Sequence, residues 1–317
     1  MNLRALPPAP DAIVHPTGAG SHKHAYKWFG AALALVGASA LQACGGDSAT
    51  APSPSIGMAR VSSEPAPPAA LSSRWQPVAS DTWQWQLRGK LNRGYAVAIY
   101  DIDLFDNSAQ TIADLHQAGR KVVCYFSAGS SEDWRPDFGQ FAPADKGKVV
   151  KRSPDSDWEG ENWLDTRSAN VRAIMTARLD RAVAKGCDGV EPDNVDAYAN
   201  DSGFPLTPAD QADFNRFIAA EARWRNLAVG LKNDVDQIAL LAPSFDFAVN
   251  EECHEQGECD KYGPFTSANK PVLNAEYEAS YRTSAGQRAL CADARARKLR
   301  TLVLSMDLDD SYRFSCD

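Results

Sequence analysis

From Trp83 to the C-terminus, short apolar runs alternate with segments whose apolar residues recur at helical spacing. Eight runs predict strands, at 83–87, 96–100, 121–126, from 187 onward, and at 228–231, 245–249, 271–275 and 301–305. Helical spacing through Ile112, Leu115 and Ala118 predicts a first helix, and further helices are predicted at about 168–185, 208–226 and 286–298. Several strand runs are continuously apolar, as parallel strands covered on both faces should be.

Eight strands alternating with helices over about 235 residues match the count and size of a (β/α)8 TIM barrel. A doubly wound open sheet is the main alternative, but no glycine-rich phosphate loop opens a first helix. The segment 130–165 is rich in Trp, Asp, Pro and Gly, and we expect it to form a long loop over the site. Trp158 and Trp163 in this loop either stack on a ligand or close the top of the barrel, and we favour the second role.

Polar residues stand at the ends of the predicted strands. They are Asp101 and Asp103, Tyr125, Asp193 and Asp196, Lys232 and Asn233, Asn250 and Glu251, and Glu276. The carboxyl ends of barrel strands converge on one mouth, so we expect these groups to meet there. The densest cluster follows Cys187, where four carboxylates fall within nine residues: Asp188, Glu191, Asp193 and Asp196. Taken alone, this cluster could equally be an acidic, solvated loop.

Two carboxylates across a barrel mouth are suited to glycoside hydrolysis, in which one protonated acid helps the leaving oxygen and one ionised acid attacks or activates water. A Ser or Cys triad needs a histidine, and after the leader only His116 and His254 remain, neither at a likely strand end. The cysteine spacings do not form a zinc site. Carboxylates alone can hold magnesium or calcium, which leaves metal-assisted hydrolysis as a minor alternative. We expect no cofactor.

Each predicted binding residue also has a structural alternative. Asp101 could bond a neighbouring loop amide, and Tyr125 could be a core aromatic residue. Lys232 and Asn233 could belong to a buried ion-pair network, and Glu276 could only neutralise Lys232. Asp188, near the start of its strand, is more readily structural.

The first 44 residues resemble an export signal. An apolar run from Trp28 to Leu41 has the length of a signal-peptide core and is short for a membrane span. It ends in Leu41-Gln42-Ala43-Cys44-Gly45, which resembles a bacterial lipobox, although Gln42 is unusual there. We expect cleavage before Cys44 and lipid on its sulfur; the alternative is ordinary secretion with Cys44 free. Residues 45–80, rich in Ser, Ala, Pro and Gly, predict a flexible linker to a domain at 81–317.

Charge limits the choice of partners. The whole chain carries −8, and the leader has more bases than acids, so the remainder is more acidic still. An acidic domain disfavours nucleic acid and anionic membrane surfaces and suits a cationic ligand. We therefore expect contact with the membrane only through a lipid anchor, and we also expect a monomer.

Without Cys44, six cysteines remain, an even number that suggests disulfides in an exported chain. Cys253 and Cys259 are close enough to close a local loop. Cys316 could tie the C-terminus to Cys291. Cys124 and Cys187 lie in predicted core strands and are either a third disulfide or buried thiols.

Several motifs, in order, resemble glycoside hydrolase family 114. They are Trp83-Gln84-Trp85-Gln86-Leu87, Tyr100-Asp101-Ile102-Asp103, Cys124-Tyr125-Phe126-Ser127-Ala128-Gly129, Glu191-Pro192-Asp193-Asn194-Val195-Asp196, Gly230-Leu231-Lys232-Asn233-Asp234 and Asn250-Glu251-Glu252-Cys253. The resemblance covers about 81–317. It implies a (β/α)8 barrel and an endo-α-1,4-polygalactosaminidase, a hydrolase of α-1,4-linked galactosamine polymer.

The resemblance implies that Asp193 and Glu251 are the catalytic pair, although Glu252 stands where Gln is expected. We expect substrate binding by Asp101, Tyr125, Asp196, Lys232, Asn233 and Glu276. A nearby Lys232 would favour ionised Asp193 as nucleophile or base, and an apolar strand before Glu251 would favour it as the acid. The alternative is a surface lipoprotein that binds polysaccharide on a barrel scaffold without turnover, because fold alone does not prove activity.

Overall fold

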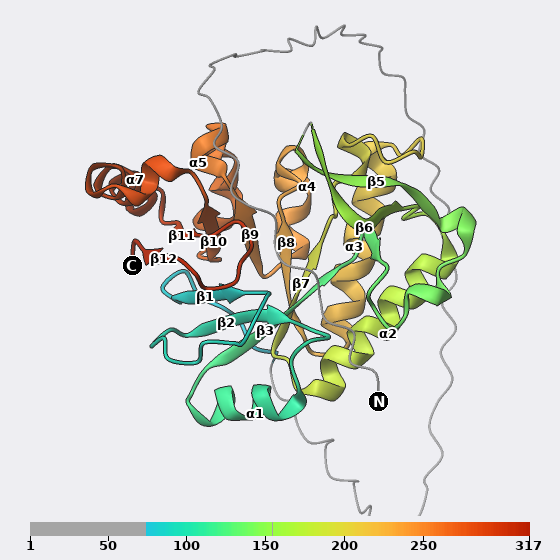
Figure 1. The fold of residues 1–317 in the computed structure, drawn as a ribbon, viewed down its shortest axis with the longest axis horizontal. Coiled ribbons are helices and arrows are strands. Elements are labelled where there is room, and N and C mark those ends of the chain that lie inside the picture. The colour runs from blue at the N-terminus through green and yellow to red at the C-terminus, as the bar shows by residue number, and fades with distance from the viewer. Residues whose placement is uncertain (1–73, 154) are drawn as a thin grey trace, which may run out of the picture. The chain divides into compact units, whose positions relative to one another are not determined.

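A computed structural model describes residues 74–153 and 155–317, and its centre is a curled, mainly parallel sheet (Figure 1). The hydrogen-bonded order is β1 (Trp83–Gln86), β2 (Ile99–Asp103), β3 (Lys121–Ser127), β7 (Gly189–Asp193), β8 (Ala228–Lys232), β9 (Phe247–Glu251), β10 (Val272–Glu276) and β11 (Arg300–Leu304). A short antiparallel strand, β12 (Arg313–Ser315), follows β11. Each of the eight parallel strands overlaps the apolar run that predicted it, although β2 is shifted from 96–100 to Ile99–Asp103, so the TIM-barrel-like α/β fold is confirmed.

Contacts from the C-terminal segment join the two ends of the sheet. The backbone N–H groups of Leu87 and Arg88 donate to the carbonyl of Leu308, at 3.0 and 3.2 Å. The Arg313 guanidinium on β12 donates to the carbonyl of Trp83 at 3.0 Å. The Trp83 indole N–H in turn donates to the carbonyl of Arg300 on β11, at 2.8 Å. The segment after β11 therefore packs against β1.

Helices cover the outside of the sheet. The longer ones are α1 (Ala109–Gln117), α2 (Ala169–Lys185), α3 (Pro208–Trp224) and α7 (Ser284–Arg297), and the shorter ones are α4 (Ile238–Leu241), α5 (Cys253–Gln256) and α6 (Gly263–Ser267). Each longer helix begins after a Ser or Thr whose hydroxyl accepts an N–H of the first turn: Ser108, Ser168, Thr207 and Thr283. Residues 87–98 join β1 to β2 without a helix, so the outer ring departs from the strict alternation predicted.

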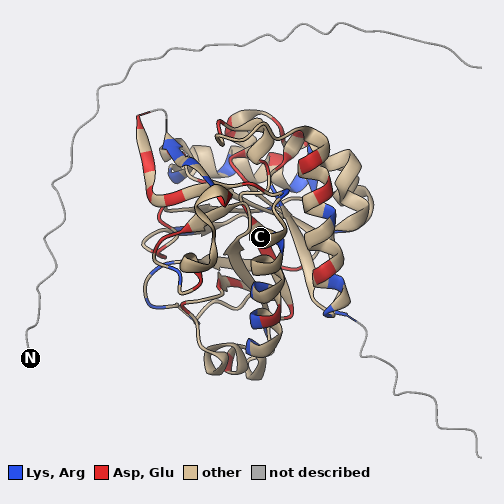
Figure 2. Cartoon of the chain, turned by 90° about the vertical axis from the view of Figure 1, so that its right-hand side faces the viewer, with Lys and Arg blue, Asp and Glu red and all other residues tan. Residues whose placement is uncertain are grey.

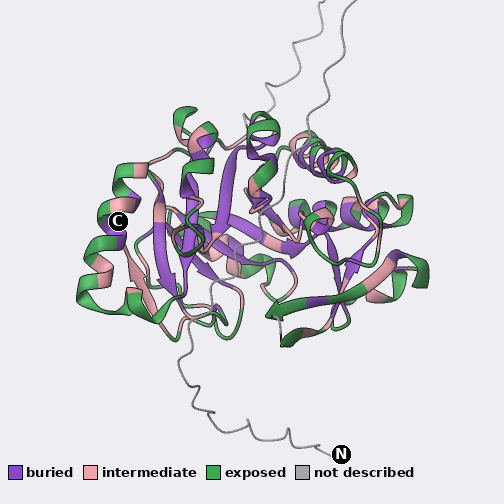
Figure 3. Ribbon diagram, turned by 90° about the horizontal axis from the view of Figure 1, so that it is seen from above, coloured by how far each residue is buried: buried purple, intermediate pink, exposed green. Residues whose placement is uncertain are grey.

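The core has one layer inside the sheet and one between sheet and helices. Figure 3 shows the strands as buried and the outer sides of the helices as exposed. Inside, Trp83 and Trp85 stack with ring centroids 5.7 Å apart. Gly230 is needed beside them, because a Cβ there would lie 2.4 Å from the ring of Phe247.

The segment predicted as a long loop is instead a second sheet. It contains β4 (Ser130–Glu132), β5 (Lys146–Ser153) and β6 (Ser156–Leu164), in the antiparallel order β4-β6-β5. Buried Arg135 joins this insertion to the barrel, since it donates to Asp103 on β2 at 2.6 Å and to Glu132 on β4 at 2.8 Å. The insertion therefore forms a wall beside the carboxyl ends of the strands.

Three disulfides fasten the domain. Cys253–Cys259 and Cys291–Cys316 form as the spacing suggested. Cys124 and Cys187, which the sequence left as disulfide or free thiols, are also bonded, and they connect β3 to the residues before β7.

The chain enters the domain at the end of the barrel opposite to the carboxyl ends of the strands. Arg74 donates to Asp246, the residue before β9, at 2.7 Å, and Trp75 packs against the interior cluster. The domain thus begins by Arg74, and residues 74–80 are not free linker as predicted. The predicted leader 1–44, its lipidation site Cys44 and linker residues 45–73 lie outside the described residues. Within the described part of the chain, no helix is long and apolar enough to cross a membrane.

Candidate active site

A cavity of about 530 Å3 opens at the carboxyl ends of the parallel strands. Its floor contains the last residues of three neighbouring strands, Asp193 of β7, Lys232 of β8 and Glu251 of β9. The inserted β4–β6 sheet and the segment after β11 form its sides. The cavity thus lies where barrel enzymes carry their reactive groups.

Lys232 lies between two carboxylates. Its Nζ is 3.0 Å from Asp193 Oδ1 and 2.9 Å from Glu251 Oε2. Both oxygens contact the same nitrogen, so they lie within about 6 Å of each other. Burial lowers the pKa of Lys232, but the attraction of Asp193, Glu251 and Glu191 outweighs burial and raises that pKa well above its usual range.

Each carboxylate also accepts a hydrogen bond from a tyrosine. The Tyr125 hydroxyl donates to Asp193 Oδ2 at 2.9 Å, and the Asn194 backbone N–H donates to Asp193 Oδ1 at 2.7 Å. The Tyr277 hydroxyl donates to Glu251 Oε1 at 2.5 Å. Asp193 therefore has three donors with Lys232, and Glu251 has two.

Sharp turns follow the strands that carry these groups. Asn194, Asn233 and Glu252 have φ values of 59°, 43° and 65°, in the left-handed region that few residues other than glycine adopt. The turn at Asn194 packs on Gly129, where a Cβ would lie 1.7 Å from the Asn194 carbonyl oxygen. The chain thus leaves each strand abruptly, and the last side chain faces the cavity.

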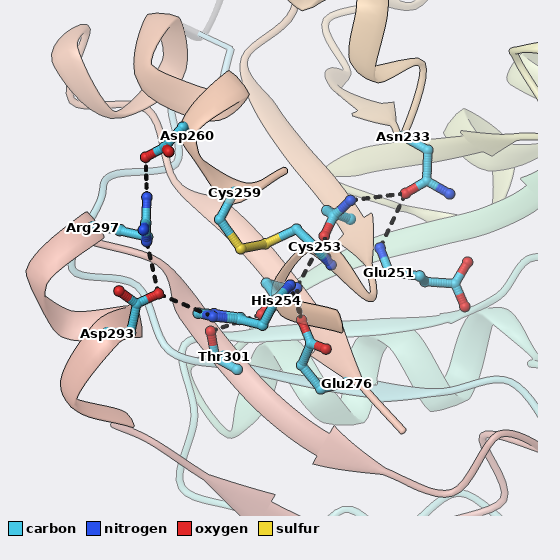
Figure 4. Close-up of a disulfide and its surroundings, with 12 residues drawn as sticks. Asn233, Glu251, Cys253, His254, Cys259, Asp260, Glu276, Asp293, Arg297 and Thr301 are labelled. Carbon is cyan, nitrogen blue, oxygen red and sulfur yellow. Dashed lines mark hydrogen bonds and ion pairs between the residues drawn. A yellow bond between two sulfur atoms is a disulfide. The ribbon is translucent and has the colours of Figure 1, made fainter. Parts of the chain in front are cut away.

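An amide and a disulfide hold the backbone at Glu251 (Figure 4). The Asn233 Oδ1 atom accepts from the backbone N–H of Glu251 at 3.0 Å and from Asn250 Nδ2 at 3.2 Å. The backbone N–H of Cys253 donates to Asn250 Oδ1 at 3.0 Å, and Cys253 is bonded to Cys259. The turn after β9 is therefore fixed from both sides.

The side-chain amide of Asn194 contacts a group of buried polar side chains. Its Nδ2 donates to Ser127 Oγ at 2.9 Å and to Glu161 Oε1 at 3.0 Å, and the Ser130 hydroxyl also donates to Glu161. Burial raises the pKa of Glu161 to about 7. These contacts connect the turn beside Asp193 to the inserted sheet.

Six of the eight predicted catalytic and binding residues line the cavity: Tyr125, Asp193, Asp196, Lys232, Asn233 and Glu251. Burial, and next the charge of Asp193, raise the pKa of Asp196 to about 6. Asp101 and Glu276 do not line it. Asp101 lies deeper, because β2 continues to Asp103 instead of ending at Tyr100. Glu276 lies under α5 and accepts the backbone N–H of His254 at 2.9 Å. Direct contact with substrate, predicted for both, does not fit these positions.

Sequence reasoning missed Trp134 and the acids of the inserted sheet. Trp134 lines the cavity and is 52% exposed, so its ring is accessible from the cavity. Trp158 and Trp163 also line the cavity. Trp158 lies beside Arg152, whose guanidinium carbon is 4.8 Å from its ring centroid. The Trp-rich composition of 130–165 was the available signal, but it did not single out Trp134.

The cavity has twice as many acids as bases. The acids are Asp103, Asp106, Glu132, Glu161, Asp193, Asp196, Glu251 and Asp307, and the bases are Arg88, Arg135, Lys151 and Lys232. Along the outer helices, in contrast, residues of both signs occur together (Figure 2). The mouth therefore favours a cationic ligand, and its tryptophans offer flat surfaces on which sugar rings can stack.

A TIM-barrel-like fold with two close carboxylates at its strand ends is the arrangement that glycoside hydrolases use. The chain belongs to the glycoside hydrolase family 114, whose family model matches residues 64–317.

Three proteins are similar to this chain in structure or in sequence. The structure of Aspergillus fumigatus Ega3 in complex with galactosamine is 43% identical, has a TM-score of 0.72, and covers 78% of this chain and 99% of its own. The glycoside hydrolase domain of Pseudomonas aeruginosa PelA has a TM-score of 0.57 at 13% identity, over 72% of this chain and 96% of that domain, and shows the fold alone. An uncharacterised Deinococcus radiodurans protein is 28% identical over 284 residues, 82% of this chain and 90% of the relative.

Proposed function

We propose that Asp193 and Glu251 cleave an α-1,4-linked galactosamine-containing polysaccharide at this mouth. The observation that carries the proposal is the pair of carboxylates bridged by Lys232, 3.0 and 2.9 Å from its Nζ. The likeness to Ega3, which was crystallised with galactosamine, supports the choice of sugar. The acid-rich lining suits the ammonium groups that a de-N-acetylated polymer carries.

Asp193 is the nucleophile in this proposal and Glu251 the proton donor. The sequence argument used Lys232 to assign the ionised role to Asp193. In the structure Lys232 contacts both acids at nearly the same distance, so Lys232 alone does not distinguish their roles. The other donors do: among the residues that the structure describes, Tyr125 and the Asn194 N–H stabilise ionised Asp193, while Glu251 has only Tyr277 in addition to Lys232.

In the first step, Glu251 gives its proton to the glycosidic oxygen while Asp193 attacks the anomeric carbon and the bond to the leaving chain breaks. In the second step, Glu251 takes a proton from water, and the water oxygen displaces Asp193 from the sugar. The two carboxylate oxygens that contact Lys232 lie within about 6 Å of each other, which suits the close carboxyl pair of retaining enzymes, about 5–5.5 Å apart, better than the roughly 6.5–9.5 Å of inverting ones. Tyr125, Asp196, Lys232 and Asn233 are the substrate-facing residues around this centre.

The direct test incubates the purified protein with partly deacetylated α-1,4-galactosamine polymer and follows the products by mass spectrometry. We expect shorter oligosaccharides from the wild type and none from Asp193→Asn, which removes the attacking charge with little change of shape. A wild-type protein that binds the polymer but releases no oligosaccharides would refute the proposal.

We also propose that the protein is exported and anchored by lipid at Cys44. Three disulfides among the described residues suit an oxidising compartment, and the segment Leu41 to Gly45 resembles a lipobox. Metabolic labelling with a radioactive fatty acid should mark the wild type and not Cys44→Ser. Equal labelling of both would rule out this anchor.

A further inference from the structure

Beneath the proposed catalytic pair, two buried carboxyl groups meet inside the barrel. Asp101 of β2 and Glu191 of β7 have no exposed surface, and their carboxyl groups are close enough for each to influence the pKa of the other. Among the described residues, no N–H or O–H group donates to any of their four carboxyl oxygens, so a hydrogen bond from one carboxyl to the other is the one way left to satisfy them. Ionised carboxylates only accept hydrogen bonds, so this contact requires a proton on at least one of the two groups.

The pair lies against the ammonium that bridges the proposed catalytic acids. Glu191 Oε1 is 3.5 Å from Lys232 Nζ, a little further than the Asp193 and Glu251 oxygens. One cation thus faces three carboxylates. If Glu191 and Asp101 were both ionised, they would add uncompensated negative charge to a buried site and would compete for Lys232.

We propose that Asp101 and Glu191 share a proton, and that this proton leaves the Lys232 ammonium free to bridge Asp193 and Glu251. Both acids are positioning residues: they lie below the cavity, and they act on the reaction through Lys232. The inference rests on the proposed function, because it assigns Lys232 to the catalytic pair named there.

Charged and titratable groups on neighbouring strands act on this pair or on Lys232. They are Asp193 on β7, Lys232 on β8, Glu251 on β9, Tyr125 on β3, and Tyr277 after β10. Burial raises the pKa of Asp101 to about 7, although its hydrogen bond to Glu191 and the charge of Lys232 oppose the rise. Burial, and then the charge of Asp101, raise the pKa of Glu191 well above its usual range.

Because the pKa values of both acids are raised, we expect the loss of the shared proton to affect turnover at alkaline pH. The pair keeps its proton in acidic and neutral solution and loses it as the pH rises. The added negative charge then draws Lys232 toward Glu191 and away from the two acids above it. Turnover should therefore decline at alkaline pH, in addition to any loss from deprotonation of the proton donor.

The test compares the pH dependence of kcat in the full chain and in two amide variants, Glu191→Gln and Asp101→Asn. Each amide keeps the shape of the acid, supplies an N–H donor and cannot ionise. We expect both variants to turn over substrate, with the alkaline decline moved upward by about one pH unit or more, a tenfold change in proton affinity.

Glu276→Gln is the matched control. Glu276 is also completely buried, and burial raises its pKa to about 7, but it binds the His254 N–H and Asn274 and has no contact with Lys232. This variant should leave the alkaline decline where it is in the wild type. An unmoved decline in both amide variants, or loss of turnover by them at every pH, would overturn the proposal.

Infrared spectroscopy tests the proton without relying on activity. The wild-type-minus-variant difference spectrum at pH 6 should contain the C=O stretch of a protonated carboxyl for Glu191→Gln or for Asp101→Asn, so one folded variant is sufficient. Carboxylate bands alone in both difference spectra would overturn the inference. A wild type without hydrolytic activity would instead refute the proposed function and leave the infrared result to decide the proton.

Discussion

Replacement of Lys232 by methionine should destabilise the protein in a pH-dependent way. The change keeps an unbranched chain of similar length and removes the buried charge, which is 2% exposed. Breaking a buried ion pair costs about 3–5 kcal/mol because the remaining charge has lost its partner. Asp193 and Glu251 keep some access to water, with side-chain exposures of 18% and 28%, so we expect a value near the lower limit, about 3 kcal/mol at pH 8.

The sign of the pH dependence follows from the charges. The pKa of Lys232 is raised in the folded protein, so its contribution is fully present below the pKa of an unfolded lysine and unchanged between pH 5 and 8. Burial raises the pKa values of Asp101, Glu191 and Asp196, and the charge of Lys232 opposes that rise. Without Lys232 these pKa values rise further, so the acids are protonated at pH 5 and are costly to ionise at pH 8. The destabilisation should therefore be smaller at pH 5 than at pH 8.

Urea unfolding of wild type and Lys232→Met at both pH values measures this difference. Turnover of the polymer should be lost in parallel, because the variant no longer holds the two acids together. A destabilisation below about 1 kcal/mol, or one that is equal at pH 5 and pH 8, would contradict the assignment of Lys232 as the buried partner of both acids.

Three further outcomes follow from the same site. Glu251→Gln should retain most activity on an aryl glycoside, whose leaving group needs no proton, while Asp193→Asn should be inactive on both substrates; the opposite pattern would exchange the roles. Proton NMR of the first product should show retained anomeric configuration, whereas inverted product would require the carboxyls to separate for a water. Gly129→Ala should lower the free energy of unfolding by about 1–3 kcal/mol and reduce kcat further, since its Cβ would displace the turn at Asn194; unchanged urea unfolding would exclude this packing role.

The barrel strands could be predicted because parallel strands are covered on both faces. Several of their apolar runs are continuous, such as those of β3 and β11, and polar side chains follow where many of the strands end. The inserted sheet lacks this signal. Its strand β5, Lys146–Ser153, is mostly exposed and polar, with Val150 buried, so composition indicated only a loop.

The sequence predicted which strands carry the site residues, but not how deeply each side chain is buried. Side chains two positions apart on a strand point the same way, so Asp101 and Asp103 look equivalent in sequence, as do Glu191 and Asp193. The deeper member of each pair is buried and the later member reaches the cavity. Which is which depends on where the strand ends, and strand ends are the part of a sequence prediction with the largest error.

The contacts of Arg74 and Trp75 determine how the domain can be held. Asp246, to which Arg74 binds, precedes β9, while Glu251 ends it. A linker or affinity tag placed before Arg74 would therefore attach at the end of the barrel where the parallel strands begin. The mouth would then face away from the surface that holds the protein. Immobilised on beads in this orientation, the protein should reach polymer chains that are themselves fixed to a surface.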